Sequence, residues 1–359
     1  MYVFILYVQS HFLYIRIFPE NKKLYKKTYM KAQRQTNLEI LRILCMLFIV
    51  TGHIGGRSGI ESSSFATIAP HAVNCFVLIS GYFLINARFK SERVLRAFIE
   101  TIFYSFTITV VLYFCGKASL YDIAKSTMPI APTKFSYWFV NKYLAVILLS
   151  PFISKVCISI SKRQYQILLV SLLLIGSSLL AVFPFGELFG NGFSLLWMGT
   201  VFITGGYLRL HNPEFKYWGV AAILLLALYN VCHLYLNNIV LLGYNSLITY
   251  ALGITTFMWF KNLPVSNNGT VAKVTMFIAP HVFAAYLIHE QGLIRTYIID
   301  VLHKFNGYMP TTLYLYLFGI VVIVLSAIAD KGRVLLFKHT GIDKLTNKIA
   351  SKLNKLYEE

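Results

Sequence analysis

The chain has 359 residues, of which 57% are hydrophobic and only 13% are charged. Soluble domains average about 45–50% apolar and about 25% charged residues, so this composition excludes a soluble fold and predicts a membrane protein. Lysine and arginine number 33 against 14 acidic residues, a formal net charge of +19. In a membrane protein such an excess is typical of cytoplasmic loops, and we predict no nucleic-acid partner from it.

Residues 1–36 form a basic lead, which we expect to be cytoplasmic. Its first 29 residues are apolar and aromatic and then basic, without the small-residue cleavage site that ends a signal peptide. Either they form an interfacial helix, or translation starts at Met30, where MKAQRQTNLEILR is an ordinary short lead into a span. We favour the start at Met30.

Apolar runs long enough to cross a bilayer predict an all-α, polytopic helix bundle of about ten transmembrane helices. Basic residues concentrate in alternate loops and in a tail, 331–359, which predicts that both termini are cytoplasmic. The loop near 117–136 departs from this alternation. A membrane domain, 37–330, thus lies between the lead and the tail. The predicted spans are 38–58, 66–86, 97–116, 137–158, 165–184, 191–210, 217–236, 239–260, 274–298 and 311–330.

The first predicted span contains three ionisable residues, Glu39, Arg42 and His53. Arg42 and His53 are eleven residues apart, or three turns plus 20°, so they share one helix face with about 16 Å between them along the axis. Glu39 lies on the same stripe and can pair with Arg42 at i, i+3. Alone, Arg42 could snorkel to the interface and His53 could pack against neighbours. Their common face favours a functional site.

The second predicted span and the loop after it carry two further motifs. Ser80 and Gly81 form a small pair inside the span, which is typical of close helix packing. Arg93 and Arg96 follow at i, i+3 on one face at the inner membrane edge. They are either anchors that set the topology or a clamp for phosphate groups, which guanidinium groups bind bidentately.

Polar residues of the fourth and ninth predicted spans complete the pattern. Trp138 fits an aromatic belt, and Tyr286 and His289 share a face at i, i+3. By the predicted topology, two groups face opposite sides of the membrane. The inner group is Arg42, Arg88, Lys90, Arg93 and Arg96, and the outer group is His53, Lys142, His289 and Glu290. The five cysteines lie in apolar stretches without metal-ligand spacing, so we predict no disulfide and no metal.

Several of these segments occur together in one order along 37–330. They are NLEILRILCMLFIVTGH, NCFVLISGY, the Arg93-x-x-Arg96 pair, YWFVNKYLAVILLSPF and AAYLIHEQ. This ordered set resembles the acyltransferase 3 family of integral-membrane acyltransferases, in its stand-alone sugar O-acetyltransferase form. The resemblance implies a multi-pass protein of the plasma membrane. It further implies transfer of an acyl group, usually acetyl, from cytoplasmic acyl-CoA to a hydroxyl of a cell-surface or lipid-linked carbohydrate such as an exopolysaccharide.

The resemblance also implies roles for individual residues. His53 is the expected general base or a transient acyl carrier, and Arg42 and Ser80 are expected to orient the donor. Arg93 and Arg96 are expected to hold the phosphates of acyl-CoA. The acceptor-side candidates are Trp138, Tyr286 and His289.

A second function remains open on the residues alone. A transporter or flippase for a sugar or a lipid-linked glycan would also place arginine and histidine inside the membrane, along its translocation path. The sequence shows neither paired broken helices nor half-to-half symmetry, the features that would favour this alternative.

Overall fold

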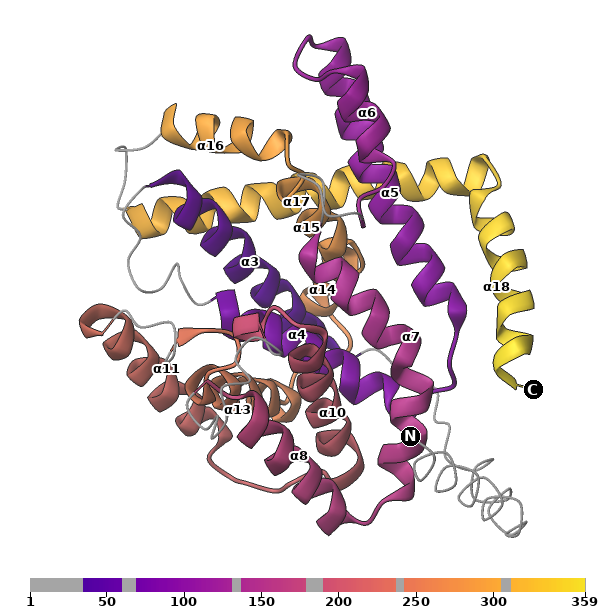
Figure 1. The fold of residues 1–359 in the computed structure, drawn as a ribbon. Helices are drawn as coiled ribbons and strands as arrows, with labels where there is room; N and C mark the ends of the chain where they lie inside the picture. The colour runs from indigo at the N-terminus through magenta and orange to yellow at the C-terminus, as the bar shows by residue number, and fades with distance from the viewer. Residues whose placement is uncertain are drawn as a thin grey trace.

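A computed structural model describes residues 35–59, 69–130, 137–178, 190–236, 242–304 and 311–358. The described residues form a bundle of helices without a strand, which confirms the predicted all-α class (Figure 1). Most of the predicted basic lead, including Met30, lies outside the described residues.

The α-helices are α3 (Thr36–Ser58), α4 (Ala69–Leu84), α5 (Ser91–Phe114), α6 (Leu120–Ser126), α7 (Trp138–Ser159), α8 (Lys162–Gly176), α10 (Leu195–His211), α11 (Trp218–Tyr235), α13 (Leu247–Asn262), α14 (Thr270–Ile278), α15 (Val282–His289), α16 (Ile294–Lys304), α17 (Thr311–His339) and α18 (Ile342–Glu358). Two short 3₁₀-helices, η2 (Gly190–Gly192) and η3 (Ala279–His281), complete the described elements. Each predicted span overlaps at least one of these helices.

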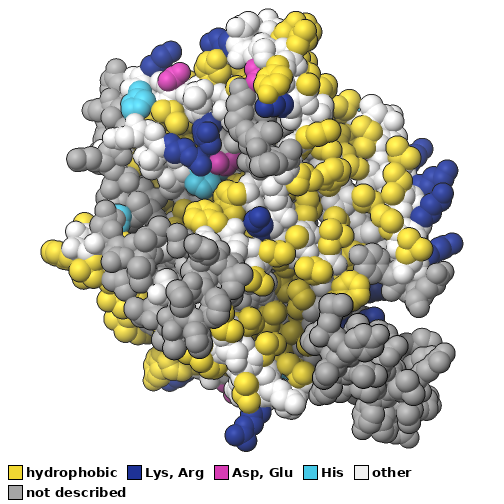
Figure 2. Space-filling model, in the orientation of Figure 1, with side chains coloured by type: hydrophobic (Ala, Val, Ile, Leu, Met, Phe, Trp, Pro, Cys, Tyr) yellow, Lys and Arg dark blue, Asp and Glu magenta, His cyan; other side chains and the backbone are white. Residues whose placement is uncertain are grey.

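Six helical stretches in the described part of the chain are long and apolar enough to cross a membrane. They are α3, α5, α7, α11, the α14–η3–α15 stretch and α17. The apolar helix α4 has 16 residues and is shorter than a full span. These helices indicate a multi-pass membrane protein, while the count of ten spans and the side of the termini stay predictions. Apolar side chains cover much of one face, with lysine and arginine toward its margins (Figure 2).

The predicted span 274–298 is not one continuous helix. The helix tightens into η3 at Pro280, which has no backbone N–H to donate. The helical stretch continues as α15 and ends at His289, and after a turn a new helix, α16, begins at Ile294. The Gln291 side chain forms this break, because its Oε1 accepts the backbone N–H groups of Leu293 and Ile294 at 2.8 and 2.9 Å. A side chain that caps the next helix therefore overrides the apolar pattern.

Helices α4 and α10 pack with their backbones in direct contact. A Cβ atom on Gly81 would lie 2.0 Å from the carbonyl oxygen of Phe202, and one on Gly205 would lie 2.3 Å from that of Leu78. Only glycine permits this approach, so the interpretation of Ser80–Gly81 as a packing motif is confirmed for Gly81. The contact brings α4, with Ser80, into the centre of the bundle beside α3 and α7 (Figure 1).

We expect Gly81→Ala to lower the thermal stability of the purified protein, since its methyl group would push α10 away at a cost of about 1–3 kcal/mol. Gly199→Ala, on the packing partner α10, is the control, because a Cβ atom at that position meets nothing within 4 Å. The measurement is the fraction of monodisperse protein left after heating in detergent. Equal melting of the two variants would show that the close approach does not hold.

Candidate active site

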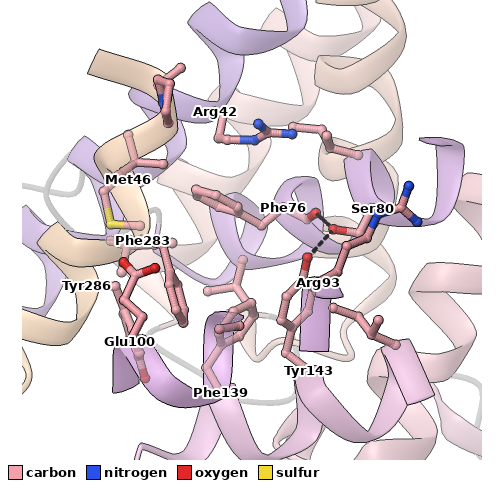
Figure 3. A pocket seen from close by; sticks show the side chains of 18 of the residues that line it. Arg42, Met46, Phe76, Ser80, Arg93, Glu100, Phe139, Tyr143, Phe283 and Tyr286 are labelled. Carbon is pink, nitrogen blue, oxygen red and sulfur yellow. Dashed lines mark hydrogen bonds between the residues drawn. The ribbon is translucent and has the colours of Figure 1, made fainter. Parts of the chain in front are cut away.

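One cavity of about 510 Å³ lies between α3, α4, α5, α7 and the η3–α15 segment. The α3 residues that line it run from Glu39 to His53 on one helix face, a rise of about 21 Å along the axis. Apolar side chains such as Met46, Phe76 and Phe283 line the middle (Figure 3). The cavity thus extends along most of α3, with ionisable groups at both ends of that helix.

The structure brings nearly all of the predicted site residues to this cavity. The predicted residues that line it are Arg42, His53, Ser80, Arg93, Arg96, Trp138 and Tyr286. The remaining predicted residue, His289, does not line the cavity but contacts His53, with His53 Nδ1 3.0 Å from His289 Nε2. Lys142, Arg88 and Lys90, which the predicted topology groups with these residues, do not line the cavity.

At the arginine end of the cavity, some guanidinium groups pair with carboxylates and others do not. Arg42 donates to the buried Glu39 at 2.7 Å, as the i, i+3 spacing predicts. Glu100, across the cavity on α5, lies 3.3 Å from Arg333. The Arg93 guanidinium has no hydrogen-bond or ion-pair partner within the described chain, and Arg96 donates to the neutral amide of Asn347 at 3.1 Å. Glu92, on the same helix, interacts with both arginines electrostatically but forms no close ion pair with either. Two guanidinium groups therefore remain available to an anion.

Hydrogen bonds at the histidine end determine which ring nitrogen of neutral His53 carries the proton. The His289 Nδ1 atom lies 2.6 Å from the carbonyl oxygen of Ala285 and must carry a proton to donate to it. In neutral His289, Nε2 is then an acceptor, so the facing Nδ1 of His53 carries a proton. Glu290 Oε1 lies 3.0 Å from the same Nδ1 and is a second acceptor. Neutral His53 is thereby left with its lone pair on Nε2, the atom that a general base requires.

Glu290 is itself held by Arg57, a residue that the sequence interpretation missed. Both terminal nitrogens of Arg57 donate to the two carboxylate oxygens of Glu290, one of them at 3.0 Å. The helical spacing offered a signal, since Arg57 follows His53 at i+4 on α3. Arg295 lies at the rim of this group, 4.0 Å from Glu290.

The same three groups could in principle hold a metal ion. One ligand atom from each of His53, His289 and Glu290 lies within 4.8 Å of the others. A cation there would have to share Glu290 with the guanidinium of Arg57, which already occupies both carboxylate oxygens. This arrangement suits a hydrogen-bonded base better than a divalent ion.

Hydroxyl groups line the cavity between its two ends (Figure 3). The Ser80 hydroxyl lies 3.0 Å from both the Phe76 carbonyl oxygen and the Tyr143 hydroxyl. Because Ser80 has one proton and gives it to Phe76, Tyr143 is the donor in the second bond. The Tyr286 hydroxyl is buried, and its proton is donated to no acceptor within the described chain. It can therefore act as a hydrogen-bond donor to a bound molecule.

A buried ionic network supports the wall of the cavity behind Glu100. Arg333 lies 3.3 Å from Glu100 and donates to Asp330 at 2.5 and 3.1 Å. Asp330 also accepts from Tyr104 at 2.8 Å and lies 2.6 Å from His281 Nδ1. The network joins α5, α17 and η3, and it was missed because Arg333 and Asp330 lie where the last span meets the basic tail.

Comparison with known proteins identifies the class that this site belongs to. Residues 35–330 match a family model described as an acyltransferase domain. A search of curated proteins and a search of solved structures find no match. The chain belongs to the acyltransferase 3 family, and with its apolar helices it is a membrane acyltransferase.

We expect Glu290→Gln to lower the turnover number for acyl transfer on the order of a hundredfold, within the range that general-base catalysis contributes. The neutral amide would not stabilise an imidazolium at His53, and its NH2 group cannot accept the hydrogen bonds that Glu290 accepts from His53 and Arg57. The Michaelis constants should change little, since Glu290 does not line the cavity. Steady-state kinetics in detergent measures both values. Arg295→Gln is the control at the rim, and equal kinetics of the two variants would contradict a positioning role for Glu290.

Proposed function

We propose that this protein is a membrane O-acyltransferase that moves an acyl group, most simply acetyl, from cytoplasmic acyl-CoA to a hydroxyl of a cell-surface or lipid-linked carbohydrate. One observation carries the proposal. A single cavity joins two arginines that form no ion pair with a carboxylate of the described chain to a histidine whose Nε2 carries the lone pair. One end of the cavity therefore offers a binding site for a phosphate-bearing donor, and the other end offers a base for a hydroxyl.

The donor is proposed to enter at the arginine end. Arg93 and Arg96 would bind the phosphates of CoA, because charged hydrogen bonds from guanidinium groups suit phosphate oxygens. Arg42 is about 16 Å from His53 along α3, so its place is beside the donor's arm and not at the reacting carbonyl. The apolar middle of the cavity then fits the narrow, largely uncharged arm that ends in the thioester.

The reaction is proposed to take place beside His53. Nε2 removes the proton from the acceptor hydroxyl, whose oxygen attacks the thioester carbonyl. The C–S bond breaks, and the departing thiolate of CoA takes that proton from the imidazolium. Tyr286 would donate to the carbonyl oxygen as it gains negative charge, since its hydroxyl proton is not used within the described chain and its ring centre lies 6.5 Å from that of His53.

The acceptor is proposed to approach along the aromatic side of the same end. Trp138 and Phe139 line the cavity beside Tyr286, and flat aromatic faces pack well against the C–H surfaces of sugar rings. Transfer through an acyl group held briefly on His53 uses the same atoms, because neutral Nε2 is also a nucleophile.

Replacing His53 tests the base. We expect His53→Ala to lower acyl transfer from radiolabelled acetyl-CoA by about 10²–10⁴-fold, the contribution typical of a general base. His303→Ala, on α16 and outside the cavity, is the control for loss of an imidazole. Full transfer by His53→Ala at normal protein levels would contradict the role. Purified wild-type protein that moves a glycan across vesicles without any acyl transfer would instead support a transporter.

Replacing the two arginines tests the donor site. We expect Arg93→Ala and Arg96→Ala each to weaken CoA binding by about tenfold or more, from about 1.5–3 kcal/mol for a hydrogen bond to a charged group. Arg88→Ala removes a positive charge from the preceding loop without touching the cavity, and its affinity should match the wild type. Calorimetric titration with CoA measures all three. Unchanged affinity in the two cavity variants would leave those arginines as topology anchors.

A further inference from the structure

The C-terminal helix α18 lies beyond residues 35–330, the part that matches the family model. It follows α17 after a turn at Gly341, which has φ 77°, a left-handed backbone conformation that glycine adopts at little cost. From this turn α18 runs across the direction of α17 and beside the N-terminal part of α5 (Figure 1). A helix that spans the membrane is thus joined directly to one that does not continue it.

Polar contacts with α5 fix the position of α18. The Ser91 backbone N–H donates to Asn354 Oδ1 at 2.8 Å, and its hydroxyl donates to the Ala350 carbonyl at 2.9 Å. Asn347 accepts from Arg96 on the same side of the helix. Thr346 and Ala350 are buried on this docked face. The rest of the α18 surface points away from the protein in a fixed orientation, and it has two distinct faces.

One of these faces is apolar. The side chains of Leu345, Ile349 and Leu356 are 59%, 42% and 68% exposed. At 100° per residue the three lie within about 40° of one another around the helix. A solvent-exposed stripe of this kind costs free energy in water, and nothing in the described chain covers it. Leu335 and Leu336 on the last turns of α17 are also exposed, so apolar surface continues toward the bilayer.

The other face is basic. Lys344, Lys348, Lys352 and Lys355 are all exposed and lie within about 80° of one another around the helix. No acidic side chain of the described chain pairs with them. Lys338 and His339 close the last turn of α17 next to this face. Lysine and arginine also line the margin of the molecule on the side where α18 lies (Figure 2).

We propose that α18 lies in the interface of an anionic lipid leaflet, with its apolar stripe at the acyl boundary and its four lysines on lipid phosphates. Adjacent apolar and lysine faces on one helix are the pattern of an interfacial helix. A single turn ties α18 to the end of a spanning helix, so the headgroup layer is the partner it meets first. The inference does not depend on the acyl-transfer reaction.

The geometry has a consequence for the donor site. Because α18 accepts from Arg96 through Asn347 and holds the start of α5 through Asn354, the lipid-bound helix contacts the part of α5 that carries the arginine end of the cavity. The headgroup layer and the proposed CoA site are thus neighbours on α5.

Fluorescence quenching by lipids tests the proposal on the full chain in vesicles. The exposed Cys115 is first changed to Ser, and the other four cysteines are buried. A fluorophore is then attached at Ile349→Cys on the apolar stripe, or at Ser351→Cys on the opposite side as the control. Brominated phosphatidylglycerol and brominated phosphatidylcholine are compared as quenchers at equal mole fraction.

We expect the position 349 label to be quenched by both lipids, and at least about fivefold more by the anionic one, the factor for one lysine near an anionic surface. Added salt should reduce this preference, since it screens surface charge. Changing all four α18 lysines to glutamine should abolish the preference. A charge-matched control with glutamine at Lys155, Lys162, Lys216 and Lys273 should keep it.

Three results would overturn the proposal. Equal quenching by the two lipids would show no preference for anionic headgroups. No quenching at position 349 would place α18 in water, as for a helix that docks a soluble partner. Quenching at position 351 as strong as at position 349 would show that the apolar stripe does not set the orientation.

Discussion

A charge inside a membrane protein costs several kcal/mol unless it is paired, and this constraint explains the arrangement of the bundle. Glu39 pairs with Arg42, Glu100 and Asp330 pair with Arg333, and Glu290 pairs with Arg57. These pairs lie in the wall of the cavity or directly behind it. Among the residues that line the cavity, Arg93 and Arg96 form no ion pair within the described chain, and the Nε2 atom of His53 is left as an acceptor. What the protein leaves unpaired is what a substrate with phosphates and a hydroxyl would use.

The packing of α4 creates the space in which these groups meet. Gly81 and Gly205 let the α4 and α10 backbones touch, so α10 packs directly against one side of α4. The other side presents Phe76 and Ser80 to the cavity, opposite α3. The two ends of α3 are connected through this space and not through the lipid. In the proposed reaction, a donor bound at the arginine end can therefore reach His53 through the protein.

The sequence predicted the helical class and most of the residues around the cavity, because both follow from local patterns. Apolar runs give spans, and the spacing of Arg42 and His53 places them on one face whatever the rest of the chain does. The partners of those residues come from distant helices, and no pattern within α3 reveals that His53 meets His289. Arg57 could have been predicted from the sequence, since it lies one helical turn after His53 on α3.

Other features could not be predicted from hydropathy. The break after α15 depends on one side chain, Gln291, whose hydrogen bonds start α16. The ion pair of Glu100 with Arg333 joins α5 to a part of α17 that the charge pattern assigned to a cytoplasmic tail. The docking of α18 rests on Ser91 and Asn354, polar residues of ordinary type. In each case tertiary contacts determine the outcome, and a one-dimensional pattern does not contain them.

In the proposed reaction, one cavity holds the donor with its phosphates at the arginines and its thioester at His53. An experimental structure with a bound non-hydrolysable acetyl-CoA analogue would locate the donor. We expect density for the phosphates beside Arg93 and Arg96, and the acyl carbonyl within hydrogen-bond reach of Tyr286 and close to His53 Nε2. An analogue bound outside this cavity, or bound with its acyl group far from His53, would contradict this arrangement.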